Sequence, residues 1–230
     1  MPLIVLWDID HTLIDNAGVS KEIYAAAFTA LTGAPPVAAA STEGRTDRLI
    51  MRNMFLRHDL PLPEWELVEV ALARAGQDRL DELARRGSTL PGVRAALKAA
   101  SVQAGWVSSV LTGNIAANAQ VKLSAFDLDR LLDLPVGAYG ADAVQRSDLV
   151  AVARRRIQRD RGLPHGAPLV LVGDTPLDVE AALVTGSRII AVATGIHSPL
   201  ELASAGASVV LPDLSDTVGL LARLEASAAF

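Results

Sequence analysis

Two aspartates near the start of the chain, Asp8 and Asp10, directly follow five apolar or aromatic residues, Leu3 to Trp7. This run shows no alternation with polar residues, which favours a strand buried on both faces, as in a parallel sheet. Asp8 would then lie at the carboxyl end of a strand, where open α/β sheets bind their ligands. Two carboxylates this close repel each other unless a cation or a proton intervenes, and Mg²⁺ prefers oxygen ligands. The pair therefore indicates a magnesium site, although a helix cap or a polar strand end would use the same residue types.

Polar residues also follow two later apolar runs. Thr112-Gly113-Asn114 closes the first, and a hydroxyl, a glycine and a helix N-terminus together suit a bound phosphate. Asp174 closes the second, with Asp178 four residues further on. Each has an ordinary alternative, because threonine, asparagine and aspartate also cap helices, form turns and occupy first helical turns. Since the carboxyl ends of parallel strands meet at one edge of a sheet, we expect these residues to gather there.

The stretch between residues 16 and 88 has a helical period and no strand pattern. We expect helices over 16–32, 46–56, 64–75 and 77–86. A helical block directly after the first strand interrupts the βαβ rhythm, so the simplest interpretation is an insert that covers the edge of the sheet. The predicted fold class is α/β, with a doubly wound, mostly parallel sheet in a core of residues 1–15 and 89–230 and an all-helical cap of residues 16–88.

The α/β rhythm resumes after the cap. We expect further strands over 106–111, 131–132, 169–172, 189–192 and 209–211. Helices are expected over 92–104, 115–124, 147–161 and 179–185.

The composition argues against several classes of protein. A net charge of −5 disfavours a general nucleic-acid binder, which needs a basic face. The chain has no cysteine, which excludes disulfides and thiolate metal sites and fits a cytoplasmic location. No apolar run approaches the ~18 residues of a membrane helix, and no basic leader precedes the first one. We therefore expect neither a membrane span nor a signal peptide.

The polar residues and their order resemble the motifs of the haloacid dehalogenase superfamily, whose members are mostly phosphatases. Asp8-x-Asp10-x-Thr12-Leu13 resembles the first motif, Thr112 the second, and Gly173-Asp174-x-x-x-Asp178 the fourth. The resemblance implies that Asp8 attacks phosphorus and that Asp10 protonates the leaving oxygen and later activates water. It also implies a Mg²⁺ ion held by Asp8, the backbone carbonyl of Asp10, and Asp174. Asp178 would hold a metal-bound water or orient a neighbour.

The third motif of the family usually offers a lysine, and none of Lys21, Lys98 and Lys122 lies in the right interval. Arg146 is the candidate replacement, because a guanidinium can grip phosphate with a planar pair of donors. The alternative is a solvated surface arginine. Together with Thr112, Gly113 and Asn114, Arg146 would bind the phosphate. His11 could reach the leaving group or point to solvent.

The cap resembles the helical insert of phosphoglycolate phosphatases and β-phosphoglucomutases. Within it, Arg45 could meet an anionic leaving group, although Thr46 or Thr42 could simply cap a helix here. The resemblance implies a magnesium-dependent phosphatase acting on a small phosphorylated metabolite, and Asp10 favours phosphate esters over halides. A phosphomutase would keep the same aspartates but return the phosphoryl group to a sugar. A non-catalytic phosphate-sensing module, similar to a receiver domain, is a third interpretation, but such domains lack a helical insert. The sequence does not predict the oligomeric state.

Overall fold

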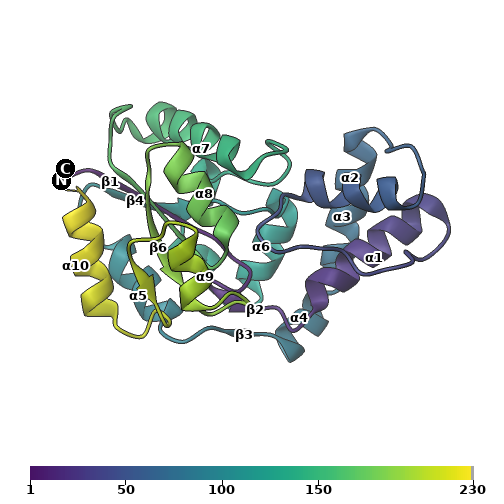
Figure 1. Cartoon of the computed structure of the whole chain (residues 1–230), viewed down its shortest axis with the longest axis horizontal. Helices are drawn as coiled ribbons and strands as arrows, with labels where there is room; N and C mark the ends of the chain where they lie inside the picture. The colour runs from purple at the N-terminus through teal and green to yellow at the C-terminus, as the bar shows by residue number, and fades with distance from the viewer. Residues whose placement is uncertain (229–230) are drawn as a thin grey trace.

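A five-stranded parallel sheet forms the centre of the larger part of the molecule, in a computed structural model that describes residues 1–228 (Figure 1). The spatial order of its strands is β4-β1-β5-β6-β7. Their bounds are β1 Leu3–Trp7, β4 Trp106–Val110, β5 Leu169–Gly173, β6 Arg188–Val192 and β7 Val210–Leu211. β1 lies between β4 and β5 and pairs in parallel with both, so it is buried on both faces. This position explains why its sequence shows no polar alternation.

Helices cover both faces of the sheet, which confirms the predicted doubly wound α/β fold. On one face, Leu3, Val5 and Trp7 belong to a hydrophobic cluster shared with three helices, α5 Val93–Ser101, α6 Ala116–Ser124 and α10 Thr217–Ala228. On the other face, Ile4 and Leu6 belong to a cluster shared with α7 Arg146–Arg161, α8 Pro176–Val184 and α9 Pro199–Ser204. Successive residues of β1 therefore supply opposite sides of the core, as the period of a strand requires.

Four helices at the other end of the molecule pack around a hydrophobic cluster of their own (Figure 1). They are α1 Val19–Thr32, α2 Asp47–Arg57, α3 Trp65–Gln77 and α4 Leu80–Arg86. Aromatic and sulfur side chains such as Phe28, Phe55 and Met51 fill this cluster. The chain enters and leaves the helices through a two-stranded antiparallel sheet, in which β2 Ile14–Asp15 pairs with β3 Ser88–Thr89.

Several local predictions were wrong, including helix boundaries that were three residues off, since α4 begins at Leu80, α5 ends at Ser101 and α8 begins at Pro176. Strand β3 begins at Ser88, where no strand was expected, because two residues are too few to show a period. The strand expected over 131–132 is instead the end of a 3₁₀ helix, Asp129–Leu131, followed by a second one, Leu134–Val136. The helix expected from residue 16 begins at Val19, because Gly18 before it has a left-handed backbone with φ 83°.

No helix within residues 1–228 combines the length and the apolar character that crossing a membrane requires.

Candidate active site

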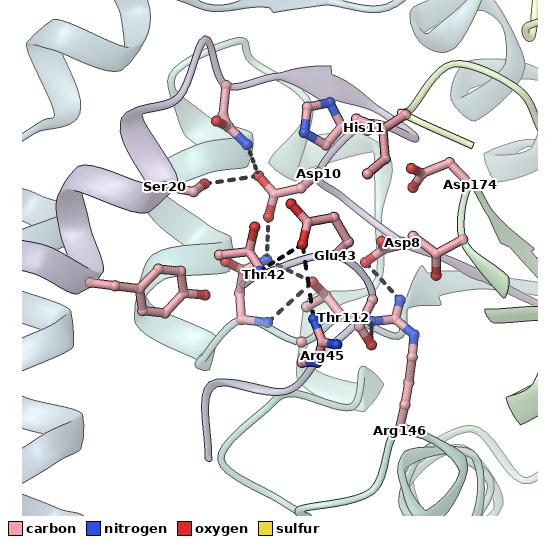
Figure 2. A pocket seen from close by; sticks show the side chains of 17 residues that line it. Asp8, Asp10, His11, Ser20, Thr42, Glu43, Arg45, Thr112, Arg146 and Asp174 are labelled. Atoms are coloured by element: carbon pink, nitrogen blue, oxygen red, sulfur yellow. Dashed lines mark hydrogen bonds and ion pairs between the residues drawn. The ribbon is translucent and has the colours of Figure 1, made fainter. Parts of the chain in front are cut away.

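The carboxyl ends of β1, β4 and β5 meet at one edge of the sheet, and a cavity of about 40 Å³ lies there (Figure 2). Its lining includes Asp8 and Asp10 after β1, Thr112 to Asn114 after β4, and Asp174 after β5. The start of α1 and the segment of residues 42–45 close it from the side of the helices. The structure thus brings the polar residues of all three strand ends to one place.

Asp8 faces the guanidinium of Arg146, with 2.9 Å between its Oδ1 and Nη2 of the arginine. The side chain of Asp8 is 8% exposed, and its backbone N–H donates to the carbonyl of Val172 in the neighbouring strand. Burial raises the pKa of Asp8 to about 6, with the charges of Asp178 and Asp10 adding to the effect and that of Arg146 opposing it. A cation placed beside Asp8 would stabilise its charged, nucleophilic form.

Arg146 is the first residue of α7, and its side chain is only 5% exposed. Its Nε donates to Asp178 Oδ1 over 2.7 Å, and its Nη2 lies 2.6 Å from the same oxygen. Although burial acts in the opposite direction, the charges of Asp178 and Asp8 raise the pKa of Arg146 above its ordinary value. The alternative of a solvated surface arginine is therefore wrong, and Arg146 is a fixed cation at the cavity.

Asp178 has two partners that explain its position. One is Arg146, and the other is Thr175, the N-cap of α8, with which Asp178 in the first turn of the helix forms a reciprocal capping box. The Thr175 hydroxyl donates to Asp178 Oδ2 over 2.7 Å. Of the two roles expected for Asp178, these contacts correspond to the orientation of a neighbour, Arg146.

Carboxylate oxygens of Asp8, Asp174 and Asp178 lie within 4.8 Å of one another. Burial, followed by the charges of Asp8 and Asp178, raises the pKa of Asp174 well above its usual value. Thr12 Oγ1 donates to Asp174 Oδ1 over 3.0 Å, and a Cβ at Gly195 would overlap the other oxygen. A buried group of carboxylates that disfavour one another's charge is a donor set that fits a hard divalent cation such as Mg²⁺.

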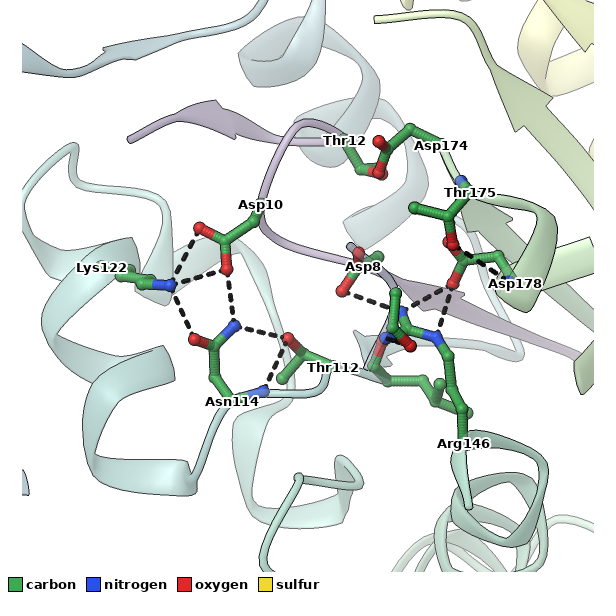
Figure 3. A network of polar contacts seen from close by, with 12 residues as sticks. Asp8, Asp10, Thr12, Thr112, Asn114, Lys122, Arg146, Asp174, Thr175 and Asp178 are labelled. Carbon is green, nitrogen blue, oxygen red and sulfur yellow. Dashed lines mark hydrogen bonds and ion pairs between the residues drawn. The ribbon is translucent and has the colours of Figure 1, made fainter. Parts of the chain in front are cut away.

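The carboxylate of Asp10 points away from this acidic group and toward α6 (Figure 3). Lys122 Nζ donates to both of its oxygens, over 2.8 and 2.6 Å, and Asn114 Nδ2 donates over 2.8 Å. Asn16 Nδ2 and Ser20 Oγ, at the entry to the helical end, donate over 2.7 and 3.2 Å. Although burial acts to raise it, Lys122, Asn114 and Asn16 lower the pKa of Asp10 to about 2, with Lys122 contributing most.

Asn114 and Lys122 were not assigned these contacts from the sequence. Asn114 was predicted to bind phosphate, whereas its side chain links Asp10, Lys122 and Thr112. Lys122 was set aside because it lies outside the expected interval for the third motif. A signal was available, since Lys122 falls on the buried stripe of its helix together with Ala119 and Leu123. A lysine on a buried stripe requires a partner.

Arg45 lines the cavity together with Glu43, and 3.9 Å separates Arg45 Nη1 from Glu43 Oε2. Lys21 Nζ lies 3.2 Å from the other oxygen of Glu43. The neighbouring Thr46 is the N-cap of α2 and accepts from the N–H of Leu49. The two interpretations of this segment are thus both compatible with the structure, because adjacent residues face the cavity and cap the helix.

The start of α2 packs directly against the loop after β4, and these contacts form the seat of α2. The backbone N–H of Asp47 donates to the carbonyl of Gly113 over 2.7 Å, and its Oδ2 accepts from the N–H of Ile115 over 2.8 Å. Tyr24 Oη donates to the other oxygen of Asp47 over 2.5 Å. Burial raises the pKa of Asp47 to about 6, against these hydrogen bonds.

Glycines allow the close approach at this seat. A Cβ at Gly113 would overlap the carbonyl oxygen of Arg45, and a Cβ at Gly140 would overlap that of Gly113. Gly44 has φ 67°, and a Cβ there would lie 2.5 Å from Thr175 Oγ1. The segment of residues 44–47 therefore lies directly against both strand-end loops.

His11 lies at the edge of the cavity and has a left-handed backbone with φ 60°. Its carbonyl accepts a hydrogen bond from Thr194 over 2.5 Å, which fixes the turn after Asp10. Its imidazole has no hydrogen bond to any other residue among 1–228, so the structure assigns it no partner.

This chain is similar in sequence and in structure to known proteins. Residues 5–183 match the family model described as haloacid dehalogenase-like hydrolase. The chain is 29% identical over 224 residues to "Probable phosphatase IndB" of Dickeya dadantii, covering 95% of this chain and 93% of that protein.

Solved structures with the same fold include a hydrolase from Pseudomonas syringae, with a TM-score of 0.68 and 19% identity over 97% of this chain and 99% of that one. CbbY from Rhodobacter sphaeroides, solved in complex with phosphate, has a TM-score of 0.68 and 20% identity over 94% and 96% of the two chains. At these identities, the likeness concerns the fold.

Proposed function

Because this chain belongs to the haloacid dehalogenase-like hydrolase family, we propose that it is a magnesium-dependent phosphatase that forms a phosphoaspartate at Asp8. The observation that carries the proposal is the pairing of a buried carboxylate, Asp8, with a buried guanidinium, Arg146, at a cavity that Thr112 also lines. A nucleophile, a fixed cation and a hydroxyl donor around one small space suit phosphoryl transfer, which depends mainly on positioning and charge.

Asp8, Asp174 and the backbone carbonyl of Asp10 would hold the Mg²⁺ ion. When bound, the ion supplies positive charge that neutralises the transferring phosphoryl group. The carboxylate of Asp10 lies outside the acidic group, so any contribution of this residue to the metal comes from its main chain. Asp178 would act indirectly, because its contacts with Arg146 hold that guanidinium in position.

In the first step, an oxygen of Asp8 forms a bond to phosphorus while the bond from phosphorus to the leaving oxygen breaks. Asp10 gives its proton to that oxygen. In the second step, Asp10 takes a proton from water, which attacks phosphorus and releases Asp8 and inorganic phosphate. The donors around Asp10 lower its pKa to about 2, so the first of these roles would require the negative charge of a bound phosphate to raise that pKa.

Thr112, the N–H of Gly113 and Arg146 would hold the phosphoryl oxygens. Asn114 would contribute through its backbone and by orienting Thr112, since its side chain is engaged by Asp10 and Lys122. Hydrogen bonds from fixed donors to developing negative charge are the main source of catalysis in such sites.

Residues 16–88 would act as a cap over the core of residues 1–15 and 89–230, and Arg45 would contact the leaving group. A cavity of about 40 Å³ under the seated α2 favours a small substrate, because it has room for only a few water-sized groups. We therefore propose a small phosphorylated metabolite of the cytoplasm as substrate, rather than a nucleic acid or a membrane lipid. The net charge of −5 supports this choice.

A panel of phosphorylated metabolites, incubated with the protein and Mg²⁺, tests the proposal through the release of inorganic phosphate. We expect release from at least one small phosphate ester and none from the Asp8→Asn variant. Transfer of the phosphoryl group to a second sugar position without release would instead identify a phosphomutase. Turnover by Asp8→Asn at the rate of the unaltered protein would refute the assigned nucleophile.

A further inference from the structure

We propose that Lys122 is a positioning residue that sets the hydrogen bonds of both Asp10 and Thr112, an inference that rests on the proposed phosphatase function. Its side chain is 2% exposed, and it does not line the cavity, whereas Asp10, Thr112 and Asn114 do. Lys122 therefore has no access to a substrate and can act on one only through these three residues.

The ammonium group of Lys122 uses all three of its donors on functional neighbours (Figure 3). Two hydrogen bonds reach the two oxygens of Asp10, over 2.8 and 2.6 Å, and one reaches Asn114 Oδ1 over 2.6 Å. An ammonium has three donors and no acceptor, so this set is complete. A lysine that served only to fill the core would not need both oxygens of one carboxylate.

The contact with Lys122 fixes which way the amide of Asn114 faces. Because a lysine can only donate, the atom facing it must be the amide oxygen, and the NH₂ group must face the other way. That NH₂ group donates to Asp10 Oδ2 and to Thr112 Oγ1, each over 2.8 Å.

The orientation of Asn114 in turn sets the direction of the Thr112 hydroxyl. Thr112 Oγ1 accepts from the side chain and from the backbone N–H of Asn114, over 2.8 and 3.3 Å. Both hydrogen bonds of the hydroxyl are thus accepted ones, which leaves its own proton for a phosphoryl oxygen. If the amide were reversed, its oxygen would face Thr112 and would compete with the phosphate for that proton.

Lys122 also holds the Asp10 carboxylate from the side of the core. Asn16 and Ser20 contact the same carboxylate from the helical end, and Ser20 has the longest of these hydrogen bonds, 3.2 Å. The donors on α6 and its preceding loop thus contact this carboxylate from a different direction than those two residues. Proton transfer to a leaving oxygen requires a carboxyl held in a defined direction, which is what these contacts provide.

The Lys122→Met variant tests the inference, because methionine has a similar length and no donor. The exposed Lys98 on α5 offers the matched control Lys98→Met, for which we expect no change in activity. The measurements are kcat and KM for an alkyl phosphate, the same for an aryl phosphate with a good leaving group, and inhibition by inorganic phosphate.

We expect Lys122→Met to lower kcat/KM, which reports the first step, at least about tenfold more for the alkyl phosphate than for the aryl phosphate. An aryl oxygen leaves without a proton, so the first step on that substrate does not need a correctly placed Asp10, whose acid role is worth about 10²-fold or more. Inhibition by inorganic phosphate should weaken several-fold, since Thr112 loses its fixed direction. Equal losses on both substrates, or no loss, would overturn the inference.

A double variant separates positioning from a structural role. In the Asp10→Asn background, Lys122→Met should cause only the several-fold further loss that passes through Thr112, because its larger effect on the alkyl phosphate passes through Asp10. Losses that multiply would show an independent, structural effect and would contradict the inference.

Thermal unfolding shows whether Lys122→Met folds, and Lys122→Gln takes its place in every measurement if it does not. Absence of phosphate release from the unaltered protein, across a panel of phosphate esters with Mg²⁺, would refute the proposed function and this inference with it. Phosphate release by the unaltered protein together with an unaffected Lys122 variant would refute the inference alone.

Discussion

Asp8 and Asp10 leave the same strand two residues apart, yet they meet opposite electrostatic environments. Asp8 lies among other carboxylates with one arginine, and its pKa is raised to about 6. Asp10 is surrounded by donors from a lysine, two asparagines and a serine, and its pKa is lowered to about 2. The end of β1 places both residues at the cavity, whereas residues of α6, α7 and α8 set the charge around each carboxylate.

The difference shows how one strand end can supply two chemical roles. The environment of Asp8 sets one guanidinium against three carboxylates and would gain from a further cation, whereas that of Asp10 is complete within the chain. Under the proposed function, the metal would therefore bind on one side of this turn and the proton donor would be held on the other.

The largest expected effect is on activity. Asp8→Asn should lower kcat for an aryl phosphate by about 10³-fold or more, because it removes the proposed nucleophile. Asp10→Asn should lower it less on the same substrate, by about 10²-fold, since that leaving group needs no proton and only the activation of water in the second step is lost. Steady-state phosphate release by the two variants checks this, and equal losses would remove the distinction between the two roles.

Arg146→Ala should lower the free energy of unfolding by about 3 kcal/mol, because it leaves two buried carboxylates, Asp8 and Asp178, without their cation. It should also weaken inorganic phosphate binding by about 1.5–3 kcal/mol, the range for hydrogen bonds to a charged group. Urea unfolding and inhibition by phosphate measure the two effects. An unchanged inhibition constant would assign the phosphate contact to another residue.

Mg²⁺ should stabilise the folded protein by about 2.7 kcal/mol when its concentration is 100 times the dissociation constant. Asp174→Asn should remove most of this stabilisation, whereas Asp10→Asn should retain it, because only the main chain of Asp10 would contact the ion. Thermal unfolding with and without Mg²⁺ provides the measurement. A loss of the effect in Asp10→Asn would place its carboxylate at the metal.

Acid should lower the free energy of unfolding, because the contribution of the ionised Asp10 is lost. The folded pKa of about 2 lies below the usual 3.8, so the unfolded chain binds more protons in that interval, and stability falls as the pH falls through it. A shift of the pKa from 3.8 to about 2 corresponds to a loss of about 2 kcal/mol of folding free energy. Solvent screening reduces this value little, because the side chain of Asp10 is only 24% exposed. Urea unfolding between pH 5 and 2 should show a smaller decline for Lys122→Met than for the unaltered protein.

The strand ends were predictable because a buried strand leaves an unbroken apolar run and the polar residues after it are conspicuous. Asp8 and Asp174 could be anticipated in this way, whereas Arg146 was chosen as the replacement for the lysine of the third motif. Lys122 could not be assigned, because its partner is 112 positions away in the sequence and becomes a neighbour only when α6 packs beside β1. The two-residue strand β3 could not be found either, since its pairing with β2 depends on the helical end being in place.

The seat between the start of α2 and the core is built largely from main-chain atoms and glycines, with Thr46, Asp47 and Arg48 as anchoring side chains. Main-chain geometry is largely indifferent to the identity of neighbouring side chains. The outward-facing residues of α2 and α3 can therefore be exchanged widely, by natural drift or by engineering, without unseating the helices. Changes of substrate preference would be concentrated in the few cavity-facing positions. By contrast, even an alanine at Gly113 or Gly140 would push the two parts of the molecule apart, because its Cβ would overlap a backbone carbonyl oxygen.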